Sequence, residues 1–337
     1  MTSYIIRRLL WIIPTVFLAL SFLFFLFFVL PGDPATLLTG GAARNVPDEV
    51  VQRANDRYGL DDPLIVQFVN YWKRFFQWDL GESYVTGRSV NEILGQAAPR
   101  SLRLAFWALI IEVIVGIAVG VVSAIRRYSF WDKMTTVATA GLAAIPAFAL
   151  GFTLQYLFAV LPGPNRWDLP EWMRLRTSGT GPDTWFAFFF PTGEEWRYLI
   201  LPAITLACVS TALLTRMVRG SMMDVQRADY MRTAKAKGLT NRQVIMRHGL
   251  RNAMLPAITL IGIDFGTAIG VAVLTETTFA WPGLGYQISQ SLVARDLPVL
   301  LGLTFAVVLA YALINLVVDV SYAWFDPRIR LGQEEQK

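Results

Sequence analysis

Residues 221–256 read SMMDVQRADYMRTAKAKGLTNRQVIMRHGLRNAMLP and separate two long apolar runs. Lys235 and Lys237 stand where the last turn of a short helix favours positive charge, because the carbonyl end of a helix is partially negative. Gly238 follows at the position that often adopts the left-handed cap conformation, which a residue without Cβ tolerates. The first half of the stretch therefore predicts a helix that ends at this glycine.

The second half of the stretch carries its own start signal. Thr240 and Gln243 have the spacing of a capping box, in which the two side chains satisfy free backbone N–H groups at a helix N-terminus. We expect the second helix to carry Val244 to Arg251, and Leu255-Pro256 to open the next apolar run, with proline in a first helical turn. The stretch is thus predicted to be a basic helix-glycine-helix segment.

Composition places the segment in a membrane protein. Of the 337 residues, 54% are hydrophobic and 16% are charged, whereas ordinary soluble chains have about 25% charged residues. Several apolar runs reach about 18 residues or more, the length that favours a membrane helix. The net charge of +5 is therefore interpreted by the side of the membrane on which the charged residues lie. No nucleic-acid partner is expected.

The apolar runs predict an all-α membrane protein with six transmembrane helices in a single domain, 1–337. Pro146 should break the third helix, since proline cannot donate a backbone hydrogen bond. For the first apolar run a secretory signal is the alternative, but that run is longer than a signal's apolar core of about 7–15 residues. The predicted spans are 9–30, 102–125, 134–161, 198–218, 255–275 and 298–325.

The distribution of lysine and arginine predicts the orientation. The short connections that hold the N-terminus, Arg126 to Lys133, residues 219–254 and the C-terminus carry a strong positive excess, and the other side is slightly negative. Positive charge stays in the cytoplasm, so we expect a multi-pass protein of the bacterial plasma membrane with both termini inside. The loop 219–254 is then cytoplasmic and the segment 31–100 extracytoplasmic.

Several stretches together resemble one family. ADYMRTAKAKGL, RHGLRNAMLP, TETTFAWPGLG and DPRIR are similar to the permease subunits of ATP-binding-cassette (ABC) importers of the peptide and nickel branch, and PGDPA and residues 60–90 extend the likeness towards the N-terminus. The chain resembles the B-type subunit of the permease pair. It has Arg232-Thr233-Ala234 where the general EAA signature reads Glu-Ala-Ala, and the peptide branch usually has the form seen here.

The resemblance implies an ABC importer permease fold in which the helix-glycine-helix loop docks into an ATPase. It also implies a second homologous permease subunit, two ATPase subunits or domains that hold ATP and Mg, and an extracytoplasmic binding protein. Ala234 and Gly238 would allow a close approach to the ATPase, with charge pairs around them. The residues expected to couple to the ATPase are Arg232, Thr233, Ala234, Lys235, Lys237, Gly238 and Leu239.

Di- or oligopeptides are the expected cargo, while relatives with these motifs also carry nickel chelates, glutathione or oligosaccharides. The chain has no phosphate-binding G-x-x-x-x-G-K-[ST] loop and no metalloprotease or nucleophile-elbow motif. Cys208 and His248 are its only cysteine and histidine. We therefore expect no catalytic residue, no metal site and no cofactor bound by this chain, and ATP hydrolysis by its partners.

The acids inside the predicted spans are the candidates for a translocation pathway, because a charge in the bilayer is costly and usually has a partner or a function. Asp264 could attract a cationic group of the substrate or could pair with a polar residue of a neighbouring helix; Glu112 and Asp319 also fall in spans. A turn between spans five and six adds further candidates. The pathway candidates are Asp264, Glu276, Phe279, Pro282 and Gly283.

A gradient-driven secondary transporter or channel, with the buried acids as ion sites, is the main alternative function. It would need no ATPase and leaves the basic loop without a role. A membrane enzyme is a further alternative, but the sequence offers no catalytic constellation for one.

Overall fold

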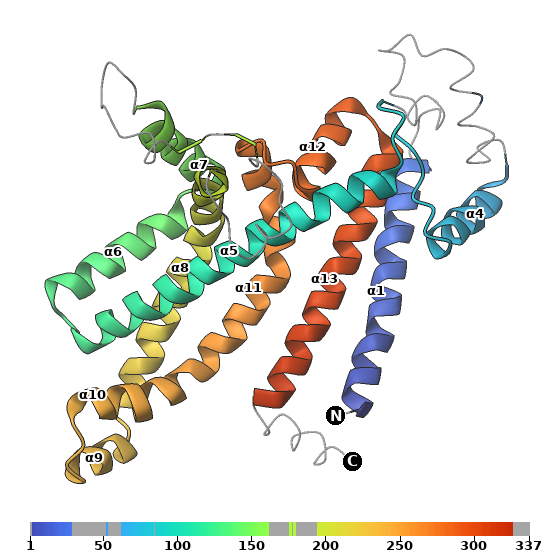
Figure 1. Cartoon of the computed structure of the whole chain (residues 1–337). Coiled ribbons are helices and arrows are strands. Elements are labelled where there is room, and N and C mark those ends of the chain that lie inside the picture. The colour runs from blue at the N-terminus through green and yellow to red at the C-terminus, as the bar shows by residue number, and fades with distance from the viewer. Residues whose placement is uncertain are drawn as a thin grey trace. The chain divides into compact units, whose positions relative to one another are not determined.

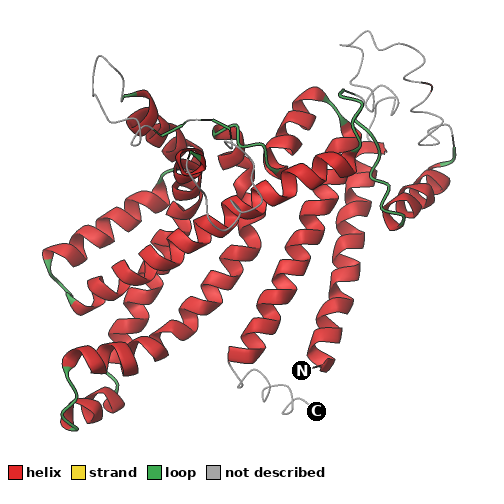
Figure 2. Ribbon diagram, in the orientation of Figure 1, coloured by secondary structure: helices red, strands yellow, loops and turns green. Residues whose placement is uncertain are grey.

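The computed structural model describes residues 2–28, 52, 62–83, 85–161, 175–176, 178–179 and 194–325. Within these ranges the regular elements are all helices (Figure 2), with one isolated antiparallel bridge between Glu82 and Ser89. The PGDPA and DPRIR motifs and most of the predicted segment 31–61 lie outside the described residues. The chain is an all-helical membrane protein.

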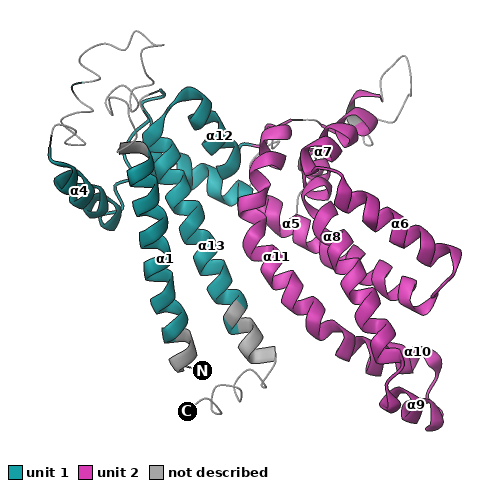
Figure 3. Cartoon of the chain, turned by 180° about the vertical axis from the view of Figure 1, so that it is seen from behind, with its two compact units in different colours: residues 1–101, 282–337 teal, residues 102–281 magenta. Residues whose placement is uncertain are grey.

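Contacts group the chain into two compact units (Figure 3). Met1–Ser101 and Pro282–Lys337 form unit 1, and Leu102–Trp281 forms unit 2. The prediction of a single domain stays a prediction.

Unit 1 is built on α1 (Thr2–Phe28) and α13 (Leu297–Phe325), which lie side by side (Figure 1). The short helix α4 (Leu64–Phe76) packs on α1 through aromatic rings. The Phe24 ring is buried at 5.2 Å from the rings of both Phe68 and Tyr71, and the Phe17 ring stacks on Trp72 at 4.9 Å. The aromatic residues of α4 thus hold it against α1.

Hydrogen bonds tie the remaining parts of unit 1 together. The Ser83 hydroxyl donates to the Asp296 carboxylate at 2.5 Å, between α12 (Leu284–Ala294) and α13. The Leu284 N–H donates to the Ser101 hydroxyl at 2.7 Å. Ser101 lies in α5 (Val90–Ile125), so this bond fixes the start of α12 to the first part of that helix.

Unit 2 contains the remainder of α5 and two long neighbouring helices, α8 (Glu195–Gln226) and α11 (Leu250–Thr278). The bent pair α6 (Phe130–Ala144) and α7 (Ala147–Gln155) packs against α8, and η1 (Tyr156–Val160) extends α7. At the end of α8 and α11 opposite to α7 lies α9 (Asp229–Ala236), followed by α10 (Asn241–Gln243) and η4 (Val244–Gly249) (Figure 1). Small buried side chains such as Ala203, Ala207 and Ala272 let α8 and α11 pack closely.

Five helices are long and apolar enough to cross a membrane, and six spans result if the bent pair counts as one. The five are Ile6–Leu26, Val90–Ile125, Glu195–Gln226, Asn241–Thr278 and Leu297–Val318, and the pair Phe130–Ala144 and Ala147–Phe158 bends by 106°. The bend occurs at Pro146, where a helical hydrogen bond is lost. The expected break is present, and the third predicted span is therefore not a single straight helix.

The prediction of a separate second helix ending at Arg251 is wrong. From Asn241 the chain stays helical through α10, η4 and α11 to Thr278, so Pro256 lies inside a continuous helix and not in its first turn. The capping box starts a helix correctly, but the apolar face of residues 250–257 packs on α8 and carries the helix onward without a stop.

Candidate functional site

The turn between α9 and α10 has the local geometry that the sequence predicts. Gly238 has a φ of +80°, and its N–H donates to the Lys235 carbonyl at 3.0 Å. The Thr240 hydroxyl accepts from the Gln243 N–H at 3.3 Å, and the Gln243 side chain accepts from the Thr240 N–H at 3.0 Å. The left-handed glycine and the capping box are both confirmed, and together they fix the angle between α9 and the next helix.

The interior of this loop is a small apolar cluster of Met231, Ala234 and Val244. Ala234 is only 6% exposed. A Cβ at Gly249 would lie 3.1 Å from the Met231 Cε, so the glycine lets α9 pack closely on η4. Ala234 therefore faces the inside of the loop, and its part in a close approach of the ATPase stays a prediction.

The outer face of α9 carries the charges. Arg232, Thr233, Lys235 and Lys237 are exposed, and Leu239 is half-buried. Arg232 lies 3.8 Å from the exposed Asp229, a pair that contributes little because water screens both partners. Tyr230 and Met246 are also exposed; sequence reasoning did not single them out, although large apolar side chains in a basic loop are a signal for a contact surface. The role of these residues stays a prediction.

A buried ion pair joins the helix that leads into the loop to α6. The Arg219 guanidinium of α8 donates two hydrogen bonds to the Asp132 carboxylate, at 2.6 and 3.0 Å. The same carboxylate accepts from the Ser123 hydroxyl at 2.5 Å and from the Tyr128 N–H at 2.9 Å. The sequence analysis did not predict this ion pair, although an acid beside a short basic connection is a weak signal for an ion pair.

Asp264 meets Glu112, the other acid inside a span of unit 2. They line one small cavity between α5, α8 and α11. Both alternatives for Asp264 stay predictions.

The turn between α11 and α12 is closed by buried side chains. Glu276 and Phe279 are buried, and the Gln155 side chain of α7 donates to the Thr278 carbonyl at 3.1 Å, which satisfies one carbonyl at the C-terminus of α11. A Cβ at Gly151 of α7 would lie 3.2 Å from the Phe279 ring. These contacts hold the end of α11 against α7.

Pro282 is half-buried and Gly283 is buried, at the cap position before α12. Three of the four candidates near this turn, Glu276, Phe279 and Gly283, are thus buried, and Pro282 is half-buried. Their part in a pathway stays a prediction.

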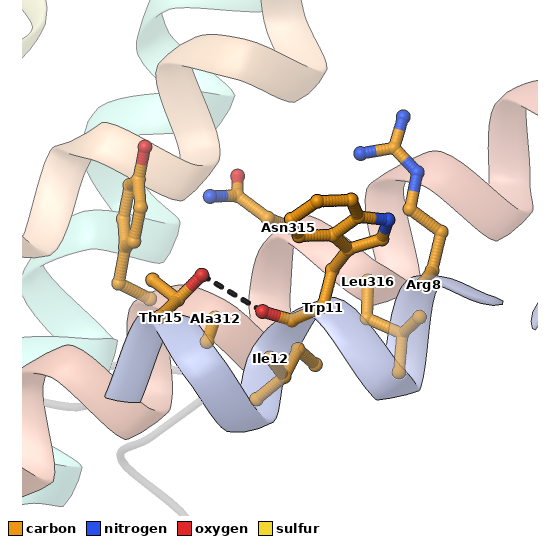
Figure 4. A pocket seen from close by; sticks show the side chains of 8 residues that line it. Arg8, Trp11, Ile12, Thr15, Ala312, Asn315 and Leu316 are labelled. Atoms are coloured by element: carbon orange, nitrogen blue, oxygen red, sulfur yellow. Dashed lines mark hydrogen bonds between the residues drawn. The ribbon is translucent and has the colours of Figure 1, made fainter. Parts of the chain in front are cut away.

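A hollow of about 210 Å³ lies between α1 and α13 in unit 1 (Figure 4). The Thr15 hydroxyl donates to the Trp11 carbonyl at 2.8 Å inside it. Among its lining residues Arg8 alone is charged. The lining residues are Arg8, Trp11, Ile12, Thr15, Tyr311, Ala312, Asn315 and Leu316. Within the described residues no group of three or more His, Cys, Asp or Glu side chains is arranged to hold a metal ion.

Comparison with known proteins identifies the family. Residues 116–331 match the model of the binding-protein-dependent transport system inner membrane component, and residues 1–105 match the N-terminal model of the same kind of membrane component. The chain is 40% identical over 315 residues to the probable D,D-dipeptide transport system permease protein DdpB of Escherichia coli K12, covering 91% of each chain. It is 38% identical over 331 residues to the glutathione transport system permease protein GsiC of the same strain, covering 98% of this chain and 99% of that one. The chain therefore belongs to the inner membrane components of binding-protein-dependent transport systems and is a non-catalytic permease subunit of a peptide/nickel-type ABC importer.

Proposed function

We propose that this permease imports di- or oligopeptides and that residues 221–256 couple it to ATPase subunits. The observation that carries the coupling proposal is the loop itself, a rigid turn at Gly238 with a cationic outer face on α9 and an apolar cluster behind it. Names of similar proteins support a small peptidic cargo, since one is named for D,D-dipeptides and one for glutathione. Nickel chelates and oligosaccharides remain the alternative cargo.

In this proposal the N- and C-termini and the loop lie in the cytoplasm, and the chain pairs with a second homologous permease. Two ATPase subunits hold ATP and Mg, and an extracytoplasmic binding protein delivers the cargo. The outer face of α9 docks into a groove on one ATPase, in the manner of a helix in a groove. Arg232, Lys235 and Lys237 pair with acidic groups at the rim, where exposed charges set orientation and partner choice more than affinity.

The loop then transmits movement because its parts move together. ATP binding draws the two ATPases together and carries α9; the Met231, Ala234 and Val244 cluster passes that displacement to the continuous helix that ends as α11. Shifting a two-state equilibrium from 1:99 to 99:1 takes about 5.5 kcal/mol of differential binding. Several docked contacts supply energy of that order, so no chemistry by this chain is needed.

Replacement of Gly238 by proline tests the coupling. Proline fixes φ near −65°, whereas Gly238 has +80°, and it removes the N–H that bonds to Lys235. We expect Gly238→Pro to abolish ATP-driven uptake into proteoliposomes while the chain still inserts in the membrane. Gly238→Asn is the matched control, because asparagine tolerates the left-handed region, and it should retain most uptake.

Persistent ATP-driven uptake by Gly238→Pro would refute the coupling role of the loop. Isolation of the complex through a tag on this chain tests the partners. Recovery of the chain without any ATPase would contradict the importer arrangement, and a co-purified binding protein would allow peptides to be compared with the alternative cargo.

A further inference from the structure

A small cavity with four polar lining residues lies inside unit 2, among helices that are largely apolar. Its volume is about 40 Å³, room for about three water molecules at 10–15 Å³ each. Four of its lining residues are polar: Glu112 from α5, Ser210 from α8, and Asp264 and Thr267 from α11. The other seven are Ala105, Ala108, Leu109, Leu206, Ala207, Ala268 and Val271, so no lysine, arginine or histidine lines the cavity.

Two carboxylate oxygens of this cavity have no hydrogen-bond partner within the described chain. Glu112 is 3% exposed, and its Oε1 is buried and unpaired. The Oδ2 of Asp264 is unpaired as well. Burying a polar atom without a partner is costly, so the cavity lacks a group that would contact these two oxygens.

Charge balance defines that group. Because no basic side chain lines the cavity, Glu112 and Asp264 together carry one net negative charge when one of the two carboxyl groups is ionised. An uncompensated charge inside a bilayer is unfavourable, and one monovalent cation neutralises it. Ca²⁺ takes six to eight oxygen ligands, and Mg²⁺ keeps several waters in an octahedron, so the four polar residues of this cavity are too few ligands for either ion.

The hydroxyl groups complete the oxygen ligands. Thr267 uses its hydroxyl proton to donate to the Asp264 carbonyl at 3.1 Å, which leaves the oxygen lone pairs available. Ser210 lines the cavity from the opposite helix. Two carboxylate oxygens and two hydroxyl oxygens from three helices suit a hard cation or an ammonium group.

We propose that Glu112, Asp264, Ser210 and Thr267 bind one small monovalent cation, of the size of sodium or ammonium, inside the bundle of α5, α8 and α11. The cation is either a free ion or the ammonium group of a peptide. The second source rests on the proposed function, and the first does not. The site makes Glu112 a binding residue for which the sequence offers no motif.

Thermal unfolding of the intact importer complex in lipid nanodiscs tests the site. The complex is heated at one pH and one ionic strength in choline chloride, sodium chloride, potassium chloride or ammonium chloride. Choline serves as the reference, because the methyl groups on its nitrogen keep the charge away from the carboxylate oxygens and it has no N–H to donate. We expect at least one small cation to raise the unfolding temperature saturably, by roughly 5 °C at a hundredfold excess over its Kd.

Variants show whether the response comes from this cavity. The double variant Glu112→Gln, Asp264→Asn should lose the response, and Asp224→Asn, which removes an exposed acid of α8, should keep it. Should the double variant fail to fold, Ser210→Ala serves instead. It removes one neutral ligand and should raise the half-saturating cation concentration by about tenfold.

A second pair of probes distinguishes the two sources. In choline chloride, alanyl-alanine is compared with N-acetyl-alanyl-alanine, which lacks the ammonium group. A response to the free dipeptide alone, lost in the double variant, assigns the site to the substrate's amine; a response to inorganic cations assigns it to a free ion. No response to any of these probes, or a response that persists unchanged in the double variant, overturns the proposal. Co-purification of the ATPases in the same preparation reports on the proposed function separately.

Discussion

The ion pair between Asp132 of α6 and Arg219 of α8 makes a contribution to stability that substitution can measure. The Asp132 carboxylate is buried and accepts two hydrogen bonds from Arg219, one from Ser123 and one from the Tyr128 N–H. Asp132→Asn keeps the shape but removes the charge and turns an amide N–H₂ towards groups that are themselves donors. Removing one partner of a buried ion pair costs about 3–5 kcal/mol. Arg219 is 25% exposed and can turn towards water, so we expect a loss of about 2–3 kcal/mol.

A double-mutant cycle isolates the pair. Arg219→Gln alone should also cost about 2–3 kcal/mol, and the double variant should cost little more than either, which corresponds to a coupling energy of about 2 kcal/mol. The free energy of unfolding of the full chain in mixed micelles, titrated with SDS, is the measurement. Arg216→Gln, an exposed cation one turn earlier on α8, should change it by less than about 0.5 kcal/mol. Additive effects of the two single changes would refute the interaction.

Two further changes are checked by the same titration. Gly120→Val should lower the free energy of unfolding by about 1–3 kcal/mol, because even a Cβ there would lie 2.8 Å from the Thr215 carbonyl oxygen. Gly141→Ala is the control: its Cβ meets nothing within 4 Å, so it should be neutral or slightly stabilising. Equal losses for the two variants would contradict this packing. Arg103→Met should cost about 3–5 kcal/mol by removing the guanidinium that lies 3.2 Å from the buried Glu195 carboxylate. Adding Glu195→Leu should restore most of the loss, and an unchanged loss in the double variant would show that the pair is not the cause.

Features set by neighbouring residues were predictable from the sequence. Gly238 and the Thr240–Gln243 capping box depend on residues within one turn of each other, and both have the expected geometry. Pro146 breaks its helix for an equally local reason. The apolar runs likewise predict long helices, because length and composition alone decide whether a helix suits a bilayer.

Features set by packing between helices were not predictable. The capping box marks where a helix starts, but nothing near Arg251 shows whether it stops, and the contacts of Ala253 and Ala257 with α8 decide that it continues. Ala234 illustrates the same limit in the site, because the sequence alone does not show that the helical face it shares with Met231 packs on Val244.

The acids inside the spans show why predicting function from sequence is harder than predicting helices. Hydropathy locates Glu112 and Asp264 separately, and each alone is an expensive charge that could face a pathway or a partner. Only the packing of α5, α8 and α11 brings the two carboxyl groups to one cavity that no basic side chain lines. A pattern within one helix carries no information about that packing, because the side-chain period of each helix is unaffected by what its neighbour presents. The chemistry of this cavity is therefore a property of the packed unit, and substitutions that separate α5 from α11 should abolish cation binding even where both acids are retained.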